Sequence, residues 1–114
     1  MIDLGSEVAV HVFSHATDMR KGFDSLSKLV REYGGDEVLS GGFFVFFSRR
    51  RDRVKVLYWE DDGYVLFYKR LEAGKFRVRE KEEIVKVSGL ELRLMLIGAL
   101  KHFKKLAKQI WCNN

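Results

Sequence analysis

The sequence contains no proline, a single cysteine and no apolar run that approaches the length of a bilayer. The lone Cys112 excludes an internal disulfide and offers no set of ligands for zinc. A membrane-spanning helix needs about 20 consecutive apolar residues, and residues 1–7 lack the basic-then-apolar layout of a secretion signal. We therefore expect a cytoplasmic protein without a membrane partner.

The motifs of common enzyme classes are also missing. There is no glycine-rich nucleotide loop ending in Lys-Ser or Lys-Thr, and no histidine stands near a nucleophile at a recognisable spacing. Glu60, Asp61 and Asp62 are adjacent, but a strand end followed by a tight turn points them in different directions, and turn chemistry explains the two aspartates. We therefore expect no enzyme, no cofactor, no metal site and no small-molecule substrate.

What the sequence does contain is apolar residues and positive charge. With 114 residues and 46% hydrophobic residues, the chain can bury a modest core, and we expect one domain over 1–114. Lys and Arg number 21 against 16 acidic residues, and a net charge of +5 favours polyanionic partners. The cations gather in two clusters, which are Arg49, Arg50, Arg51, Arg53 and Lys55, and Lys101, Lys104, Lys105 and Lys108.

The hydrophobic pattern predicts an α+β fold. A helix is expected from an N-cap at Thr17 or Asp18 to about Tyr33, and a second one opens with a capping box at 88–91. Strands are expected at 7–13, 43–47, 54–59 and 64–71, with a shorter run at 76–78. The order favours an antiparallel β-sheet, a meander with an Arg-rich hairpin, packed against an N-terminal and a C-terminal helix.

The Asp62-Gly63 pair predicts a two-residue hairpin loop. This loop pairs Trp59 with Leu66, Leu57 with Tyr68, and Lys55 with Arg70, so these residues share one face of the hairpin. The opposite face is mostly apolar, and we expect the helices to pack on it. Its members are Val54, Val56, Tyr58, Val65, Phe67, Lys69 and Leu71.

Two stretches carry a more specific pattern. The first is Thr-Asp-Met-Arg-Lys-Gly-Phe-Asp at 17–24. The second has Arg-Arg-Arg-Asp-Arg-Val-Lys at 49–55, Gly-Tyr at 63–64, and Lys-Arg-Leu-Glu-x-Gly-x-Phe at 69–76. In order and spacing they resemble the short accessory protein, often called TnpB, that is encoded beside the DDE-type transposase in the insertion-sequence class numbered sixty-six. Ser48 departs from the Asn common in that family. The resemblance implies participation in transposition without defining a step.

The arginine cluster is the first candidate site. Guanidinium groups bind phosphate oxygens in a forked geometry, so Arg49, Arg50, Arg51 and Arg53 at a hairpin tip are predicted to contact DNA. Two alternatives remain open: contact with an acidic patch on a protein partner, and a solvated loop.

Further cations extend this candidate site. Lys55, Lys69 and Arg70 lie near Trp59, Tyr64 and Tyr68, which together suit a platform for exposed bases, although the core is the favoured location for Trp59 and Tyr68. Arg20 and Lys21 are expected on the first helical turn, where they add phosphate contacts, while Asp18 caps the helix.

Two functions follow from these residues and the resemblance. The first is a non-catalytic accessory factor that contacts DNA at the ends of the insertion sequence. The second is an adaptor that binds the transposase, or the other small element-encoded protein, without binding DNA. The basic segment 100–111 suits either docking on a partner or covering the sheet.

Overall fold

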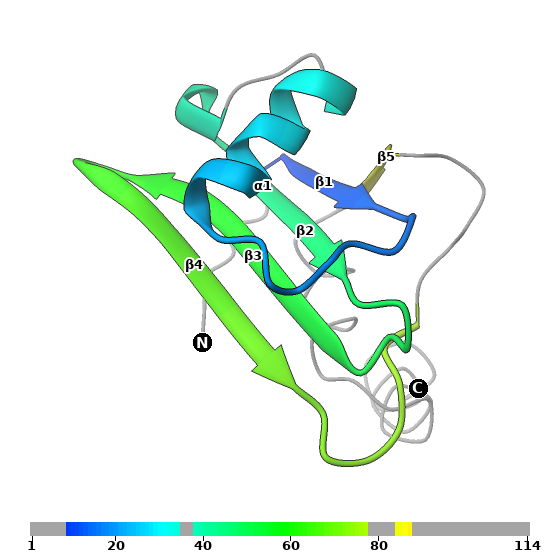
Figure 1. Cartoon of the computed structure of the whole chain (residues 1–114). Helices are drawn as coiled ribbons and strands as arrows, with labels where there is room; N and C mark the ends of the chain where they lie inside the picture. Colours follow the sequence, from blue (N-terminus) through cyan, green and yellow to red (C-terminus); the bar gives the residue numbers. More distant parts are fainter. Residues whose placement is uncertain (1–8, 35–37, 78–83, 88–114) are drawn as a thin grey trace, which may run out of the picture.

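In the computed structural model, the described residues are 9–34, 38–77 and 84–87 (Figure 1). In chain order the elements are β1 (Val10–Phe13), α1 (Phe23–Leu29), the π-helical turn η1 (Val30–Gly34), the 3-10 turn η2 (Val38–Ser40), β2 (Phe43–Phe47), β3 (Arg53–Glu60), β4 (Gly63–Arg70) and β5 (Ile84–Val87). Within these ranges, no helix is long and apolar enough to cross a membrane.

The strands form a mixed sheet in the order β4-β3-β2-β1-β5. β1 and β2 run parallel, whereas the other neighbours are antiparallel. The prediction of an antiparallel sheet packed against an N-terminal and a C-terminal helix is therefore wrong: the described part is a mixed sheet, mostly β, with one short α-helix. The long connection through α1 carries the chain back across the sheet, so β2 enters in the direction of β1. The predicted C-terminal helix lies outside the described residues.

β5 was not predicted, although its sequence Ile-Val-Lys-Val is typical of a strand. It pairs antiparallel with β1, with Val10 opposite Val87 and Phe13 opposite Ile84. The short strand expected at 76–78 is not formed at Phe76 and Arg77. Phe76 instead is buried, and its amide donates to the carbonyl of Arg51.

β2 is buried on both faces, which explains its uninterrupted apolar sequence. Its alternate side chains enter two hydrophobic clusters, one on each side of the sheet. The first cluster contains Val10, Val12, Phe43, Val45, Phe47, Val54, Val56 and Phe76. The second contains Phe13, Leu26, Val30, Val38, Phe44, Phe46 and Leu57.

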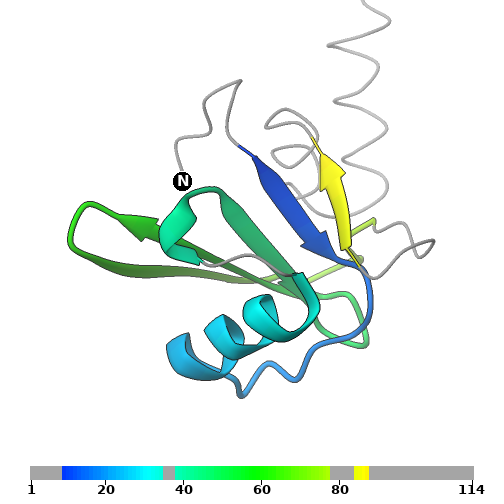
Figure 2. The same cartoon turned by 90° about the horizontal axis from the view of Figure 1, so that it is seen from above.

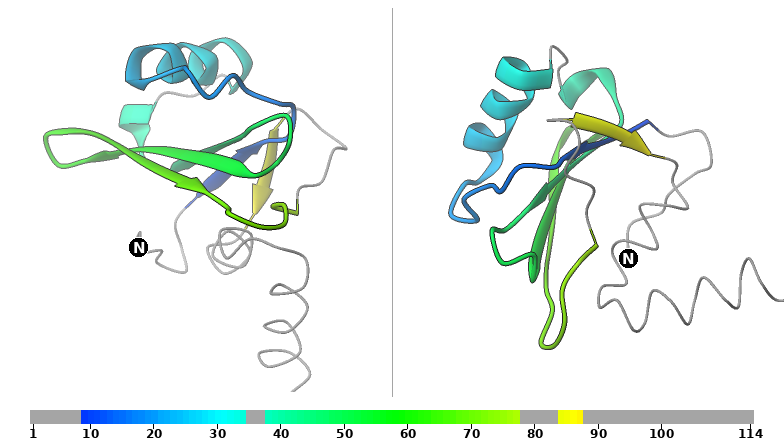
Figure 3. Two further views of the ribbon diagram at one scale, coloured as in Figure 1. Left: turned by 60° about the horizontal axis from the view of Figure 1, so that its bottom comes forward. Right: turned by 90° about the vertical axis from the view of Figure 1, so that its right-hand side faces the viewer.

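α1 and η1 cover the face of the second cluster (Figures 2 and 3). Leu26 and Val30 are fully buried there, packed with Leu57 of β3. We expected the helices on the opposite face of the β3–β4 hairpin, and for α1 this prediction is wrong. The face that carries Leu57 is also largely apolar, because Trp59, Tyr64 and Leu66 lie partly buried against the second cluster.

α1 begins later than predicted. Its N-cap is Gly22, which has no side-chain capping bond, and not Thr17 or Asp18. The ammonium of Lys55 donates to the carbonyls of Met19 and Lys21, at 2.7 Å each. These carbonyls thus accept from a side chain, and residues 18–21 form a turn closed by a bond from the Lys21 amide to the Asp18 carbonyl.

The β3–β4 hairpin has the predicted faces but a different pairing. Trp59 lies opposite Tyr64, Leu57 opposite Leu66, and Lys55 opposite Tyr68. The two loop residues are Asp61 and Asp62, because Glu60 pairs with Gly63. Asp61 takes a left-handed φ of 49°, a conformation that aspartate tolerates better than most residues.

Candidate nucleic-acid interface

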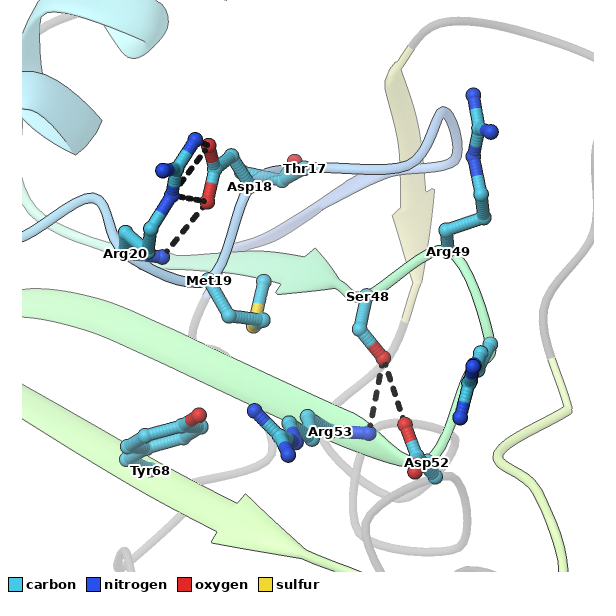
Figure 4. Close-up of a pocket in the computed structure, with 10 residues that line it drawn as sticks. Thr17, Asp18, Met19, Arg20, Ser48, Arg49, Asp52, Arg53 and Tyr68 are labelled. Atoms are coloured by element: carbon cyan, nitrogen blue, oxygen red, sulfur yellow. Dashed lines mark hydrogen bonds and ion pairs between the residues drawn. The ribbon is translucent and has the colours of Figure 1, made fainter.

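Two loops meet at the end of β2. We call residues 17–21 the aspartate loop and residues 48–53 the arginine loop. They are joined by a hydrogen bond of 2.8 Å from the Thr17 amide to the Phe47 carbonyl. Between them lies a groove of about 600 Å³ (Figure 4). It is lined by Thr17, Asp18, Met19, Arg20, Ser48, Arg49, Arg50, Asp52, Arg53 and Tyr68.

The arginine loop is fixed by its own polar groups. The Ser48 hydroxyl donates to the Asp52 carboxylate at 3.1 Å and accepts from the Arg53 amide at 3.1 Å (Figure 4). The Ser48 amide and carbonyl are also bonded, to the Arg53 carbonyl and the Arg51 amide. From outside, the Leu71 amide donates to the Asp52 carbonyl. These bonds hold the loop backbone in one conformation, and the side chains of Arg49, Arg50 and Arg53 take no part in them.

Three guanidinium groups are open on this loop. Arg49, Arg50 and Arg53 are exposed, and none of their side chains forms an ion pair or a hydrogen bond with another described residue. In Figure 4 the Arg53 side chain points toward Tyr68, whereas Arg49 extends away from Asp52. Arg51 differs: it is half-buried, has a left-handed φ of 60°, and lines a separate hollow of about 250 Å³.

The aspartate loop holds a closed ion pair. The Asp18 carboxylate accepts bonds from the Arg20 side chain, the shortest at 2.6 Å, and from the Arg20 amide at 2.9 Å. The hydrogen bonds from the Arg20 side chain hold the pKa of Asp18 well below its ordinary value, and the same bonds raise the pKa of Arg20. Arg20 thus lines the groove with its charge already balanced.

Lys55 lies beneath the groove, inside the fold. It is only 7% exposed, and its ammonium is bonded to the two carbonyls of the aspartate loop. The same ammonium lies over the Tyr68 ring, 4.7 Å from its centroid. Lys55 therefore fixes one wall of the groove and one ring that lines it.

The remaining predicted residues do not line the groove. Lys21 is half-buried, and its carbonyl accepts from Lys55. Arg70 binds Glu72 at 3.0 Å, and this hydrogen bond raises the pKa of Arg70. Lys69 pairs with Val54 and so belongs to the opposite face of the sheet. The groove thus gathers Arg49, Arg50, Arg53 and Arg20 from the predicted set.

The location predicted for Tyr68, which lines the groove, was wrong. This residue was favoured as a core residue together with Trp59; Trp59 does pack against the second cluster, but Tyr68 is 50% exposed. β4 is at the edge of the sheet, so Tyr68 has a neighbouring strand on one side only. The signal available in the sequence was that Tyr68 shares its predicted hairpin face with the cations Lys55 and Arg70.

Comparison with known proteins places the chain in a family. A model of the family described as IS66 Orf2-like protein matches residues 8–105. Two proteins of Sinorhizobium fredii (strain NBRC 101917 / NGR234) are similar over 99 residues, or 86% of this chain. Uncharacterized protein y4hO is 35% identical with 86% of its length covered, and uncharacterized protein y4jC is 31% identical with 85% covered. No solved structure matches the chain. The family inferred from the two sequence stretches is thereby confirmed: the chain belongs to the IS66 Orf2-like family, whose role is accessory to an insertion sequence.

Proposed function

We propose that this protein is a non-catalytic accessory factor in transposition that contacts DNA through the arginine loop. The observation that carries the proposal is the set of three exposed guanidinium groups, Arg49, Arg50 and Arg53, without partners among the described residues. Each guanidinium presents a planar fork of donors that matches two phosphate oxygens. During transposition, the polyanion that these groups can bind is the phosphate backbone of DNA at the ends of the insertion sequence.

The rigidity of the loop supports this proposal. Ser48 and Asp52 fix the backbone from within, and the amide of Phe76 bonds the Arg51 carbonyl from outside at 2.6 Å. A loop that is already ordered loses less conformational entropy when it binds than a flexible one. The arginines therefore start from fixed backbone positions, and only their side chains have to be ordered on a phosphate.

The overall charge acts in the same direction. The net charge of +5 attracts DNA from a distance, and this attraction weakens as salt screens it. However, overall charge alone does not distinguish the arginine loop from any other basic surface. The experiment must therefore separate the removal of particular phosphate-binding groups from the removal of charge.

The test is a salt titration of binding to duplex DNA from the ends of the insertion sequence. The variant replaces Arg49, Arg50 and Arg53 with alanine. Each arginine–phosphate interaction that is removed lowers the slope of log K against log salt by roughly 0.9, so the triple substitution lowers it by roughly 2.7. The matched control replaces three exposed cations outside the groove with alanine and so removes the same charge. These cations are Lys28, Arg31 and Lys75.

The control is expected to keep most of the slope of the natural protein. If the arginine variant binds as tightly and as salt-dependently as the natural protein, the arginine loop does not bind the DNA. If both variants show the same decrease in slope, binding depends on overall charge, and the assignment to this loop also fails.

An adaptor function is the second candidate, and exposed apolar side chains favour it. Phe23, Tyr33 and Leu39 are about half exposed and lie on α1, η1 and η2. Aromatic and aliphatic side chains of this kind are enriched at protein interfaces. Purified transposase captured by the natural protein but not by a Tyr33→Ser and Leu39→Ser variant, with DNA absent, would support this function.

A further inference from the structure

The groove combines open arginines with an open aromatic ring. Tyr68 is 50% exposed and lines the same groove as Arg49, Arg50 and Arg53. Binding to the phosphates of a duplex needs cations alone, because the faces of paired bases are covered by their neighbours in the stack. An exposed ring beside open guanidinium groups is the combination found where single strands bind, with cations on the backbone and an aromatic side chain under a base.

The orientation of the ring is fixed. Tyr68 lies directly opposite Lys55 in the β3–β4 pairing, and the Lys55 ammonium is 4.7 Å from the ring centroid. That ammonium is held in place by the carbonyls of Met19 and Lys21. One face of the ring is thus covered by a buried cation, while the residue as a whole is 50% exposed and lines the groove. A ring already held in position loses little entropy when a base stacks on it.

One of the open cations lies on the same face of the sheet as this ring. Arg53 is the diagonal neighbour of Tyr68 across the strands, because Arg53 pairs with Arg70 and Lys55 pairs with Tyr68. Diagonal neighbours on one face lie within reach of long side chains, and Figure 4 shows the Arg53 side chain directed toward Tyr68. A base on the ring therefore has its own phosphate group within reach of this guanidinium.

We propose that the groove binds an unpaired nucleotide of single-stranded DNA, with its base stacked on Tyr68 and its phosphates on Arg53 and Arg49. This inference rests on the proposed DNA-contacting function and adds the strand preference. The groove volume of about 600 Å³ is in the range of sites that enclose a small molecule, and so suits one nucleotide. Unpaired DNA arises wherever the ends of an insertion sequence are opened.

The test compares three fluorescent probes by anisotropy: an oligothymidine of about ten nucleotides, a duplex of equal length, and an oligouridine of equal length. The variants are Tyr68→Ala and Tyr68→Phe, and the matched control is Tyr33→Ala, which removes another exposed tyrosine. Tyr68→Ala is expected to weaken binding of the oligothymidine roughly 5- to 150-fold. Tyr68→Phe, Tyr33→Ala and duplex binding are expected to change less than about threefold.

A second measurement reports stacking directly. A single 2-aminopurine in the oligothymidine loses fluorescence when it stacks on a ring, and this quenching is expected with the natural protein and with Tyr68→Phe but not with Tyr68→Ala. Thermal unfolding by circular dichroism shows whether Tyr68→Ala is folded. If Tyr68→Ala is unfolded, two other variants are used for the test. Quenching is then expected with Tyr68→Phe and is expected to be lost with Arg53→Ala.

The outcomes separate the two proposals. If Tyr68→Ala leaves oligothymidine binding unchanged while the triple arginine variant weakens binding to duplex, the single-strand inference is overturned and the proposed function stands. If the natural protein binds no probe, both are overturned. Tighter binding of oligouridine than of oligothymidine overturns the assignment to DNA.

Discussion

The aspartate loop and the arginine loop lie on opposite sides of one groove and are both rich in cations, but they use charge differently. In the aspartate loop, Arg20 is neutralised by Asp18, and the loop is held from beneath by Lys55. In the arginine loop, a hydroxyl, a carboxylate and backbone groups hold the structure. The guanidinium groups of Arg49, Arg50 and Arg53 therefore stay available.

The contrast is sharpest between two residues on one face of one strand. Lys55 is buried with two carbonyl partners, whereas Arg53, two residues earlier, is exposed at the start of β3. The aspartate loop lies over Lys55 but leaves Arg53 at the groove. A dense run of cations in a sequence therefore says little about which of them can bind a ligand, because the covering segment decides it.

The largest effect is expected from removing the cation under the aspartate loop. Lys55→Met keeps the apolar stem but leaves the carbonyls of Met19 and Lys21 without a partner, and it removes the cation over Tyr68. We expect unfolding to become easier by about 2–3 kcal/mol, measured from urea unfolding. Lys28→Met, which changes an exposed lysine on α1, is the control and is expected to change stability by less than about 0.5 kcal/mol. Equal effects of the two substitutions would show that Lys55 does not hold the loop.

A smaller effect on stability is expected from removing the Ser48 hydroxyl, which holds the arginine loop. Ser48→Ala removes the bond to the Asp52 carboxylate and the bond from the Arg53 amide. Because both groups lie near solvent, we expect stability in urea unfolding to fall by about 1 kcal/mol. Ser48→Asn is the matched variant, since its amide keeps one donor and one acceptor, and its stability is expected to fall less. A decrease with Asn as large as with Ala would contradict this account of the loop.

The sequence predicted well those features that depend on local pattern. Strand β2 was predicted at its observed bounds because all five of its residues are apolar, so that neither face of the strand suits contact with solvent. The two faces of the β3–β4 hairpin were also predicted, since alternation fixes them whichever two residues form the loop. The exposure of Arg49, Arg50 and Arg53 follows from charge at a turn.

Features that depend on distant contacts were not predicted. α1 begins only after the aspartate loop, whose Met19 and Lys21 carbonyls accept from Lys55, a residue more than 30 positions away. The parallel pairing of β1 with β2 depends on the path of the connection between them, which no local pattern encodes. Tyr68 was expected in the core as an aromatic residue, but it lies on an edge strand and is half exposed.

The effect of the Asp18 carboxylate on stability is expected to be smaller than that of the Ser48 hydroxyl, and it depends on pH. Hydrogen bonds from Arg20 lower the pKa of Asp18 below its ordinary value of 3.8, so the folded state favours the charged carboxylate. The contribution of Asp18 to stability is therefore fully present above pH 3.8 and declines as the pH falls toward the lowered pKa. We expect the stability difference between the natural protein and Asp18→Asn, from urea midpoints, to shrink steadily below that pH. Asp62→Asn, which removes an exposed turn carboxylate, controls for the removal of one negative charge. A difference that stays constant with pH would mean that the ion pair does not contribute.

The smallest effect on stability is expected on the open side of the groove. Arg50→Ala removes an exposed guanidinium that has no partner among the described residues, so urea unfolding is expected to change by less than about 0.5 kcal/mol. Removing one arginine–phosphate interaction should nevertheless lower the salt slope of DNA binding by roughly 0.9. The same measurements on Arg20→Ala provide the comparison, because Arg20 lines the same groove but is bound to Asp18. We expect Arg20→Ala to affect stability more and the salt slope less, since it leaves the Asp18 carboxylate without its partner. The reverse ranking would mean that the open cations are on the aspartate loop, and that the arginine loop serves the fold.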